Sequence, residues 1–189
     1  MNYLQIISGA ARGEDAVFQR AVDGTARSYA LLNIIILGIL YGLSNLVGVY
    51  AQGVELPLAG AYLFITPALF GILGIVTMCG ATIGLCLVYW AAAKGFGGPA
   101  GFGLVLDLVG LSAVPFWALA PLLNYAIQFA PNREIPISLL IPIALAFFWT
   151  FNVVRKSLVV GQGLSMGKAT LAVASMWIFS TSAVYLFLP

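Results

Sequence analysis

Apolar residues in this chain fall into five long runs, and short segments of glycine, proline and charged residues separate them. About 20 apolar residues in a helix cross the hydrocarbon core of a bilayer, and every run reaches that length. None of the runs alternates apolar and polar residues as a half-buried strand does. The pattern predicts an all-α bundle of five transmembrane helices within residues 28–189. The expected spans are residues 28–50, 61–93, 102–129, 136–158 and 166–188.

Residues 1–27 differ from the rest because charged residues interrupt them. Their apolar residues form two candidate helical faces: Tyr3, Leu4, Ile6, Ile7 and Ala10 on the first, and Val17, Phe18 and Ala21 on the second. This pattern predicts two short amphipathic helices in the cytoplasmic interface of the membrane, and a partly ordered tail is the alternative. The segment lacks a short apolar core with a small-residue cleavage site, so we expect no cleavable signal peptide.

The composition agrees with a membrane protein, because 62% of the 189 residues are hydrophobic and 7% are charged. A soluble domain carries about 25% charged residues, which cover its surface. The net charge of +2, without a basic run, argues against binding to nucleic acid. We therefore expect the partners of this chain to be membrane lipids and other integral membrane proteins.

Basic residues are distributed unevenly between the two sides of the expected bundle. With five spans and a cytoplasmic amino terminus, only Arg133 of the eight basic residues lies outside. The positive-inside rule therefore predicts an N-in, C-out orientation. The seven basic residues expected on the cytoplasmic side are Arg12, Arg20, Arg27, Lys94, Arg155, Lys156 and Lys168.

Asp107 is an acid well inside a predicted span, about one turn from the start of residues 102–129. Acids within membrane segments are rare and by default mark a functional site. A proton or cation path through Asp107 is one interpretation. The favoured one is a structural ion pair with a basic residue of the cytoplasmic loops, namely Lys94, Arg155, Lys156 or Lys168.

Two pairs of glycines have the small-xxx-small spacing that lets helix backbones approach closely. They are Gly38 with Gly42 in the first span and Gly80 with Gly84 in the second. We expect all four glycines to lie in helix-packing faces, and Gly38 and Gly42 to pack within the chain.

Proline and asparagine also occur inside the predicted spans. Pro115 and Pro121 lie in the third span, where each removes a helix hydrogen bond and so predicts a kink. Asn33 and Asn45 lie in the first span, where an unpaired amide is costly. We therefore expect the two asparagines to form hydrogen bonds that tie helices together.

The sequence lacks the residue sets that carry common enzymatic chemistry. Histidine is absent, and no paired catalytic carboxylates or metal-ligand cluster occur. Residues 95–103, GFGGPAGFG, follow a membrane helix rather than a strand, which favours a tight turn over a nucleotide-binding loop. We expect no enzymatic activity, no metal site and no required cofactor. A bound lipid or pigment remains compatible with the apolar spans.

Three stretches resemble a known family: YGLSNL at residues 41–46, KGFGGPAGFGLVLDLVGLSAVPFWALAPLL at 94–123 and FFWTFNVVRKSLVVGQGLSMGKATLAV at 147–173. Their glycine turn, proline-containing helix and final turn before the last helix are similar to the Yip (Ypt-interacting protein) domain family in its short prokaryotic form. The resemblance covers roughly residues 28–188. It implies a five-span protein without enzymatic chemistry. It also implies a location in the bacterial cytoplasmic membrane or a membrane derived from it.

Three functions are compatible with these observations. The leading hypothesis is a non-catalytic accessory, scaffold or assembly subunit that binds other membrane proteins, for instance within a larger bioenergetic complex. Small-residue faces and the small extramembrane mass favour it. The first alternative is a pathway for a small solute or ion centred on Asp107. The second is a lipid-binding or membrane-shaping role for residues 1–27 and the Arg155-Lys156 pair.

Overall fold

Helices make up most of the computed structural model, which describes residues 2–129 and 136–187. The expected all-α fold is confirmed for this part of the chain. Two helices form in the amino-terminal segment, and the others form in the five apolar runs. Their bounds are α1 Tyr3–Arg12, α2 Asp15–Val22, α3 Arg27–Ala51, α4 Tyr62–Gly95, α5 Phe102–Leu111, α6 Phe116–Asn124, the π-helical η1 Tyr125–Phe129, α7 Ile137–Gln162 and α8 Met166–Phe187.

Among the described residues, three helices are long and apolar enough to cross a membrane, namely α3, α4 and α7. The pair formed by α5 and the α6–η1 segment makes a fourth if the two halves count as one span. The helix α8 forms in the fifth apolar run but is not among these candidates. Apolar helices of this length indicate an integral membrane protein, with three or four candidate spans where the sequence predicts five.

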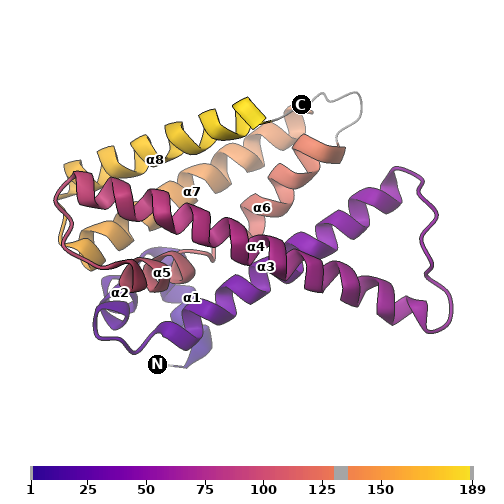
Figure 1. Ribbon diagram of the computed structural model, residues 1–189, viewed down its shortest axis with the longest axis horizontal. Helices are drawn as coiled ribbons and strands as arrows, with labels where there is room; N and C mark the ends of the chain where they lie inside the picture. The colour runs from indigo at the N-terminus through magenta and orange to yellow at the C-terminus, as the bar shows by residue number, and fades with distance from the viewer. Residues whose placement is uncertain (1, 130–135, 188–189) are drawn as a thin grey trace.

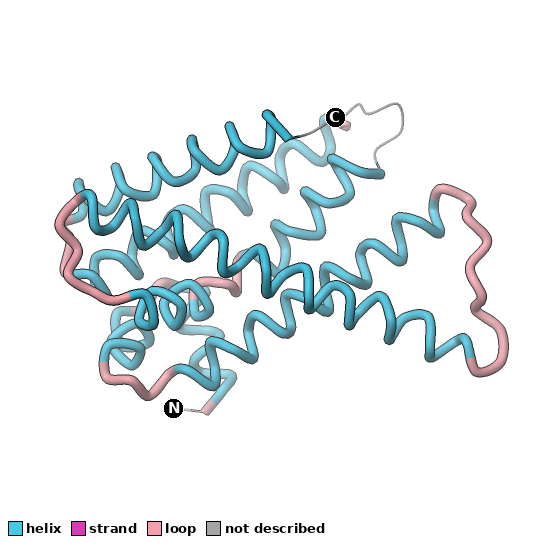
Figure 2. The backbone as a smooth tube through the Cα atoms, in the orientation of Figure 1, coloured by secondary structure: helices cyan, strands magenta, loops and turns pink. Residues whose placement is uncertain are grey.

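The long helices α3 and α4 form an antiparallel hairpin, and they cross near their middles (Figure 1). The carboxyl-terminal half of α4 runs beside α8, and α7 packs against α8. The short helices α1, α2 and α5 gather at the end of the molecule where α3 begins. The loop that joins α3 to α4 lies at the opposite end (Figure 2).

The helices α1 and α2 are packed onto the bundle. A capping box between Asn2 and Gln5 starts α1, and Gly13 ends it in the left-handed conformation, with a φ of 69°. The buried apolar residues of the two helices meet α5 and α7, and they are Ile6, Ala10, Val17, Phe18 and Ala21. Leu4 was expected on the same face but is 73% exposed. The alternative of a partly ordered tail is therefore wrong for residues 3–22.

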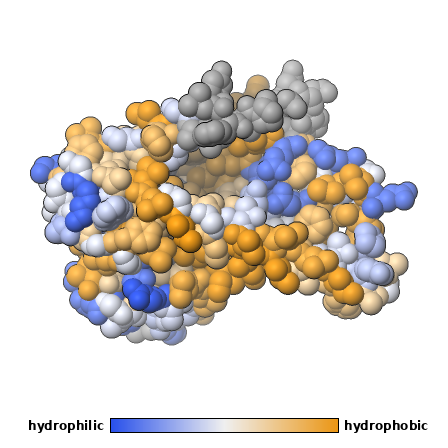
Figure 3. Space-filling model, in the orientation of Figure 1, coloured by the Kyte–Doolittle hydropathy of each residue, from blue (hydrophilic) through white to orange (hydrophobic). Residues whose placement is uncertain are grey.

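A second core lies between α4, α5, α7 and α8. Tyr89 at its centre is fully buried, and its hydroxyl bonds to Ser157 and to the carbonyl oxygen of Val154. The outer surface exposes many large apolar side chains, unlike the surface of a soluble protein. In the view of Figure 3, hydrophilic residues gather toward the two ends of the long axis and hydrophobic ones cover much of the middle. A bilayer solvates such a middle zone.

The third predicted span is broken rather than kinked. Its two halves, α5 and the α6–η1 segment, are bent by 80° at residues 112–115. Pro115 has no backbone N–H to continue the hydrogen bonds of α5, and it serves as the N-cap of α6. Pro121 lies inside α6, and the backbone then widens into η1. The change at Pro115 is larger than the expected kink, whereas α6 continues through Pro121, so the kink expected there stays a prediction.

Candidate functional site

Asp107 lies in an ion pair that joins α5 to the first residue of α3. Its carboxylate accepts hydrogen bonds from Arg27, with Nε 3.3 Å from Oδ1 and Nη2 3.4 Å from Oδ2. The Asp107 side chain is 7% exposed and that of Arg27 is 66% exposed. The two parallel contacts have the fork geometry that favours arginine over lysine as a carboxylate partner.

The basic residues expected to pair with Asp107 lie elsewhere. Lys94 donates from Nζ to the carbonyl oxygen of Pro99 at 2.9 Å, and Lys156 pairs with Asp15 at 2.9 Å. Arg155 donates to Asn152 on its own helix. Lys168 stands at the start of α8 and makes none of the salt bridges found among the described residues. The expected partner was wrong because α5 turns Asp107 toward α3, where Gly110 packs on Ala30.

Asn33 connects four helices at the same end of the bundle. It is fully buried, and its Oδ1 accepts from the Tyr3 hydroxyl of α1 at 2.8 Å. Its Nδ2 donates to the carbonyl oxygen of Gly110 on α5 at 3.2 Å, and its own carbonyl accepts from Trp117 Nε1 of α6 at 3.1 Å. Burial also raises the pKa of the Tyr3 phenol. Asn33 thus has the tying role expected for it.

A second polar cluster ties α3 to α6 farther along the bundle. Asn124 donates from Nδ2 to Ser44 Oγ at 3.0 Å and to Asn45 Oδ1 at 3.1 Å. Asn45 therefore also bonds to another helix. The Oδ1 atom of Asn124 is buried and has no hydrogen-bond partner among the described residues.

At the junction of α3 with α5, the Asp107 carboxylate and the Asn33 amide both have hydrogen-bond partners. The Arg27–Asp107 pair and the Asn33 hydrogen bonds together hold α1, α3, α5 and α6 in one arrangement. The walls of four cavities described for the molecule do not include Asp107. The arrangement is suited to fixing helix positions. Within the described residues, no cluster of His, Cys, Asp and Glu could hold a metal ion.

The four glycines expected to pack helices divide into two groups. A Cβ at Gly38 would lie 2.5 Å from Ile75 Cα, and one at Gly42 would overlap the carbonyl oxygen of Phe70. The backbones of α3 and α4 thus touch at these glycines, as expected. Gly80 and Gly84 are exposed, and a Cβ at either would meet no atom of the described chain within 4 Å. Gly80 and Gly84 thus pack against no helix of the described chain, and their expected role in helix packing stays a prediction.

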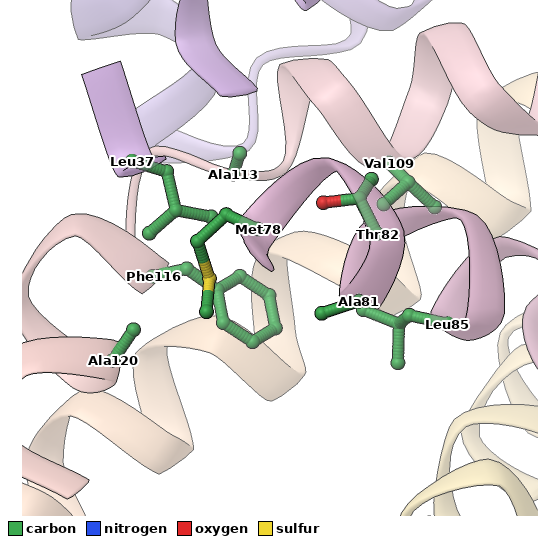
Figure 4. A pocket seen from close by; sticks show the side chains of 9 residues that line it. All are labelled: Leu37, Met78, Ala81, Thr82, Leu85, Val109, Ala113, Phe116 and Ala120. Atoms are coloured by element: carbon green, nitrogen blue, oxygen red, sulfur yellow. The ribbon is translucent and has the colours of Figure 1, made fainter. Parts of the chain in front are cut away.

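Apolar cavities flank α6 where the third span is broken. One holds about 190 Å³ between α3, α4, α5 and α6, and Leu37, Met78 and Phe116 project toward one another in it (Figure 4). Thr82 is the polar member among its nine lining residues. Another, of about 290 Å³, lies between Phe116 on α6 and Trp177 on α8. Such walls favour hydrocarbon, and a bound lipid or pigment remains a hypothesis for them.

Sequence reasoning missed several residues of the junction. Arg27 was assigned to the amino-terminal segment, although it is the last basic residue before the first span and so stands where α3 begins. Trp117 carries an indole N–H that needs a partner when buried, which is a usable signal.

No family model matches this chain, and no curated protein or solved structure matches it either.

The Arg27–Asp107 pair predicts unequal effects of removing its two partners. Arg27→Gln leaves a buried carboxylate without its cation and is expected to lower the free energy of unfolding by about 2 kcal/mol. Asp107→Asn leaves an exposed guanidinium and is expected to cost about 1 kcal/mol or less. Unfolding can be followed with a thiol-reactive dye in a Cys79→Ala background, because the remaining Cys86 is fully buried. Equal losses in the two variants would contradict this assignment.

Proposed function

We propose that the chain is a non-catalytic integral membrane protein that binds other membrane proteins as an accessory, scaffold or assembly subunit. A strip of small residues on α4 carries the proposal. Thr77, Gly80 and Gly84 lie at helical spacing, and all three are exposed. The Thr77 hydroxyl bonds back to the carbonyl oxygen of Leu73 at 2.9 Å, so the strip presents no unsatisfied hydroxyl.

The strip is shaped for a helix more than for lipid tails. A glycine inside a helix costs about 1 kcal/mol relative to alanine, and these two form no close contact within the described chain to offset that cost. A second helix gains from them because its backbone can approach closely. Three exposed apolar side chains border the strip as ridges, and they are Val76, Ile83 and Leu87.

The test compares proteins that co-purify with the wild-type chain and with a Gly80→Leu/Gly84→Leu variant, both isolated from native membranes in mild detergent. We expect the wild type to retain a membrane-protein partner. The variant should lose at least about 90% of it, since leucines at close-packing positions hold the helices apart. Native mass spectrometry gives the partner's mass and stoichiometry.

Gly167→Leu on α8 is the matched control, because Gly167 is also exposed and a Cβ there meets nothing within 4 Å in the described chain. It should keep the partner. A wild-type protein that runs as a lone monomer would contradict the proposal. A complex made solely of copies of this chain would contradict the accessory role.

We further propose that the chain is a short Yip-type protein of the bacterial cytoplasmic membrane or a membrane derived from it, with five spans in an N-in, C-out orientation. The five spans of this proposal are α3, α4, the broken α5–α6 pair, α7 and α8, and the family assignment rests on the resemblance of residues 41–46, 94–123 and 147–173. Two lysines support a cytoplasmic amino terminus, because basic residues concentrate on the cytoplasmic side. Lys94 lies in the last turn of α4, and Lys156 on α7 pairs with Asp15 of α2.

A further inference from the structure

A cavity with a basic wall lies where the turn between α1 and α2 meets α7. It holds about 210 Å³ and is lined by Ala11, Arg12, Gly13, Trp149, Asn152, Val153, Arg155 and Lys156. Three of these lining residues are cationic and none is acidic. We propose that this cavity binds a phosphate-bearing anion, supplied by an anionic phospholipid headgroup or by free phosphate.

Arg155 is the cation of this cavity that pairs with no acid among the described residues. Its Nε atom is buried and has no hydrogen-bond partner within the described part of the chain. Its Nη2 donates to Asn152 Oδ1 at 2.8 Å, and none of the salt bridges found there includes it. A guanidinium offers donors in a rigid fork that matches phosphate oxygens. The bond to Asn152 leaves its other donors for a ligand.

The other two cations are only partly neutralised. Lys156 pairs with Asp15 at 2.9 Å, and Arg12 contacts Glu14 at 3.5 Å in a largely exposed pair. Exposed pairs of this kind contribute little and exchange readily. The wall therefore keeps an excess of positive charge after Glu14 and Asp15 are counted.

Contacts between α1 and α7 hold the walls of the cavity together. Trp149 Nε1 donates to the carbonyl oxygen of Ala11 at 2.6 Å. The left-handed Gly13 packs against the Lys156 side chain, whose Cγ lies 3.6 Å from a Cβ built at that glycine. The cavity is thus formed by docking of α1 onto α7.

The position of the cavity along α7 suits a headgroup. The 26 residues of α7 span about 39 Å, which exceeds the hydrocarbon core by about 9 Å, or about six residues. If that excess lies at the carboxyl end, the interface falls near Lys156. Basic side chains concentrate at that level, where Arg155 and Lys156 line the cavity.

The experiment titrates the purified protein with phosphatidylglycerol or sodium phosphate, with phosphatidylcholine as the lipid without net charge, and counts bound molecules by native mass spectrometry. We expect the first phosphatidylglycerol to bind about tenfold more weakly to Arg155→Gln and to Arg12→Gln than to the wild type. Arg155→Lys should lose less than Arg155→Gln. Lys94→Gln removes the same charge from a residue outside the cavity and should stay within about twofold of the wild type.

The dye assay at Cys86 confirms that each variant is folded before it is titrated. Phosphate binding that depends on Arg155 and Arg12 identifies free phosphate as a source, and phosphatidylglycerol binding with that dependence identifies a headgroup. Either result upholds the site. The site is overturned if phosphatidylglycerol and sodium phosphate each bind equally to Arg155→Gln, Arg12→Gln and Lys94→Gln. It is also overturned if neither of these two anions binds to the wild type.

Discussion

Replacing Gly42 with valine is expected to destabilise the protein more than any other single change considered for α3. A Cβ at Gly42 overlaps the carbonyl oxygen of Phe70, which belongs to the backbone of α4 and cannot rotate away. At the same crossing, a Cβ at Gly74 would overlap the carbonyl oxygen of Gly38. The two helices must therefore move apart along the pair that packs most extensively in the chain.

We expect the loss to be about 3 kcal/mol, at the upper end of the range for overpacked cores. For a chain of this size that corresponds to a fall of roughly 10 °C in the unfolding midpoint. The dye assay at Cys86 measures it, with Gly42→Ala as a milder variant. Gly80→Ala is the matched control, because its Cβ meets open space and a helical alanine is favoured over glycine. Equal midpoints for Gly42→Ala and Gly80→Ala would contradict the close crossing.

The elements of this fold follow from local pattern. Each apolar run contains a helix, and the predicted faces of residues 1–27 contain the apolar side chains that α1 and α2 bury, from Ile6 to Ala21. Local pattern suffices there because a helix places residues three and four apart on one face. It failed for Leu4, which lies on the predicted face but outside the contact with the bundle.

Pairings between distant segments could not be predicted in the same way. Gly38 with Gly42 and Gly80 with Gly84 share one spacing, yet the first pair touches α4 and the second faces away from the chain. Spacing identifies a face that permits close approach and carries no information on what approaches it. The partner of Asp107 could not be predicted for the same reason. Arg27 is 80 residues away, and the orientation of α5 decides which basic residue Asp107 contacts.

The bend at residues 112–115 also exceeds what the residue types foretell. Proline predicts a missing hydrogen bond, but the angle depends on what packs around the break. Here α5 is held by Arg27 through Asp107 and by Asn33 through Gly110, while Trp117 on α6 bonds to the backbone of Asn33. The bonds on both sides of the break thus converge on the first turns of α3, which stabilises an 80° bend.

Replacing Asn33 with leucine is therefore expected to have the second-largest effect on stability. The substitution removes the acceptor of the Tyr3 hydroxyl and the donor to the Gly110 carbonyl oxygen in a fully buried position. Each polar group left buried without a partner costs about 1–3 kcal/mol, so we expect a loss of about 2–3 kcal/mol. The Tyr3 ring keeps its stacking on Tyr29, with centroids 6.0 Å apart, which softens the loss.

The same substitution should loosen α1 before the rest of the bundle unfolds, because Tyr3 joins α1 to Asn33. Limited digestion with trypsin reports this, since Arg12 lies in the last turn of α1. We expect cleavage after Arg12 to be about tenfold faster in Asn33→Leu than in the wild type. Tyr3→Phe is the matched control, since it keeps the ring and removes one hydrogen bond, and it should show an intermediate rate. If cleavage is as fast in the wild type as in Asn33→Leu, then Asn33 does not hold α1 in place. If Asn33→Leu unfolds at the wild-type temperature, the hydrogen bonds of Asn33 contribute no net stability.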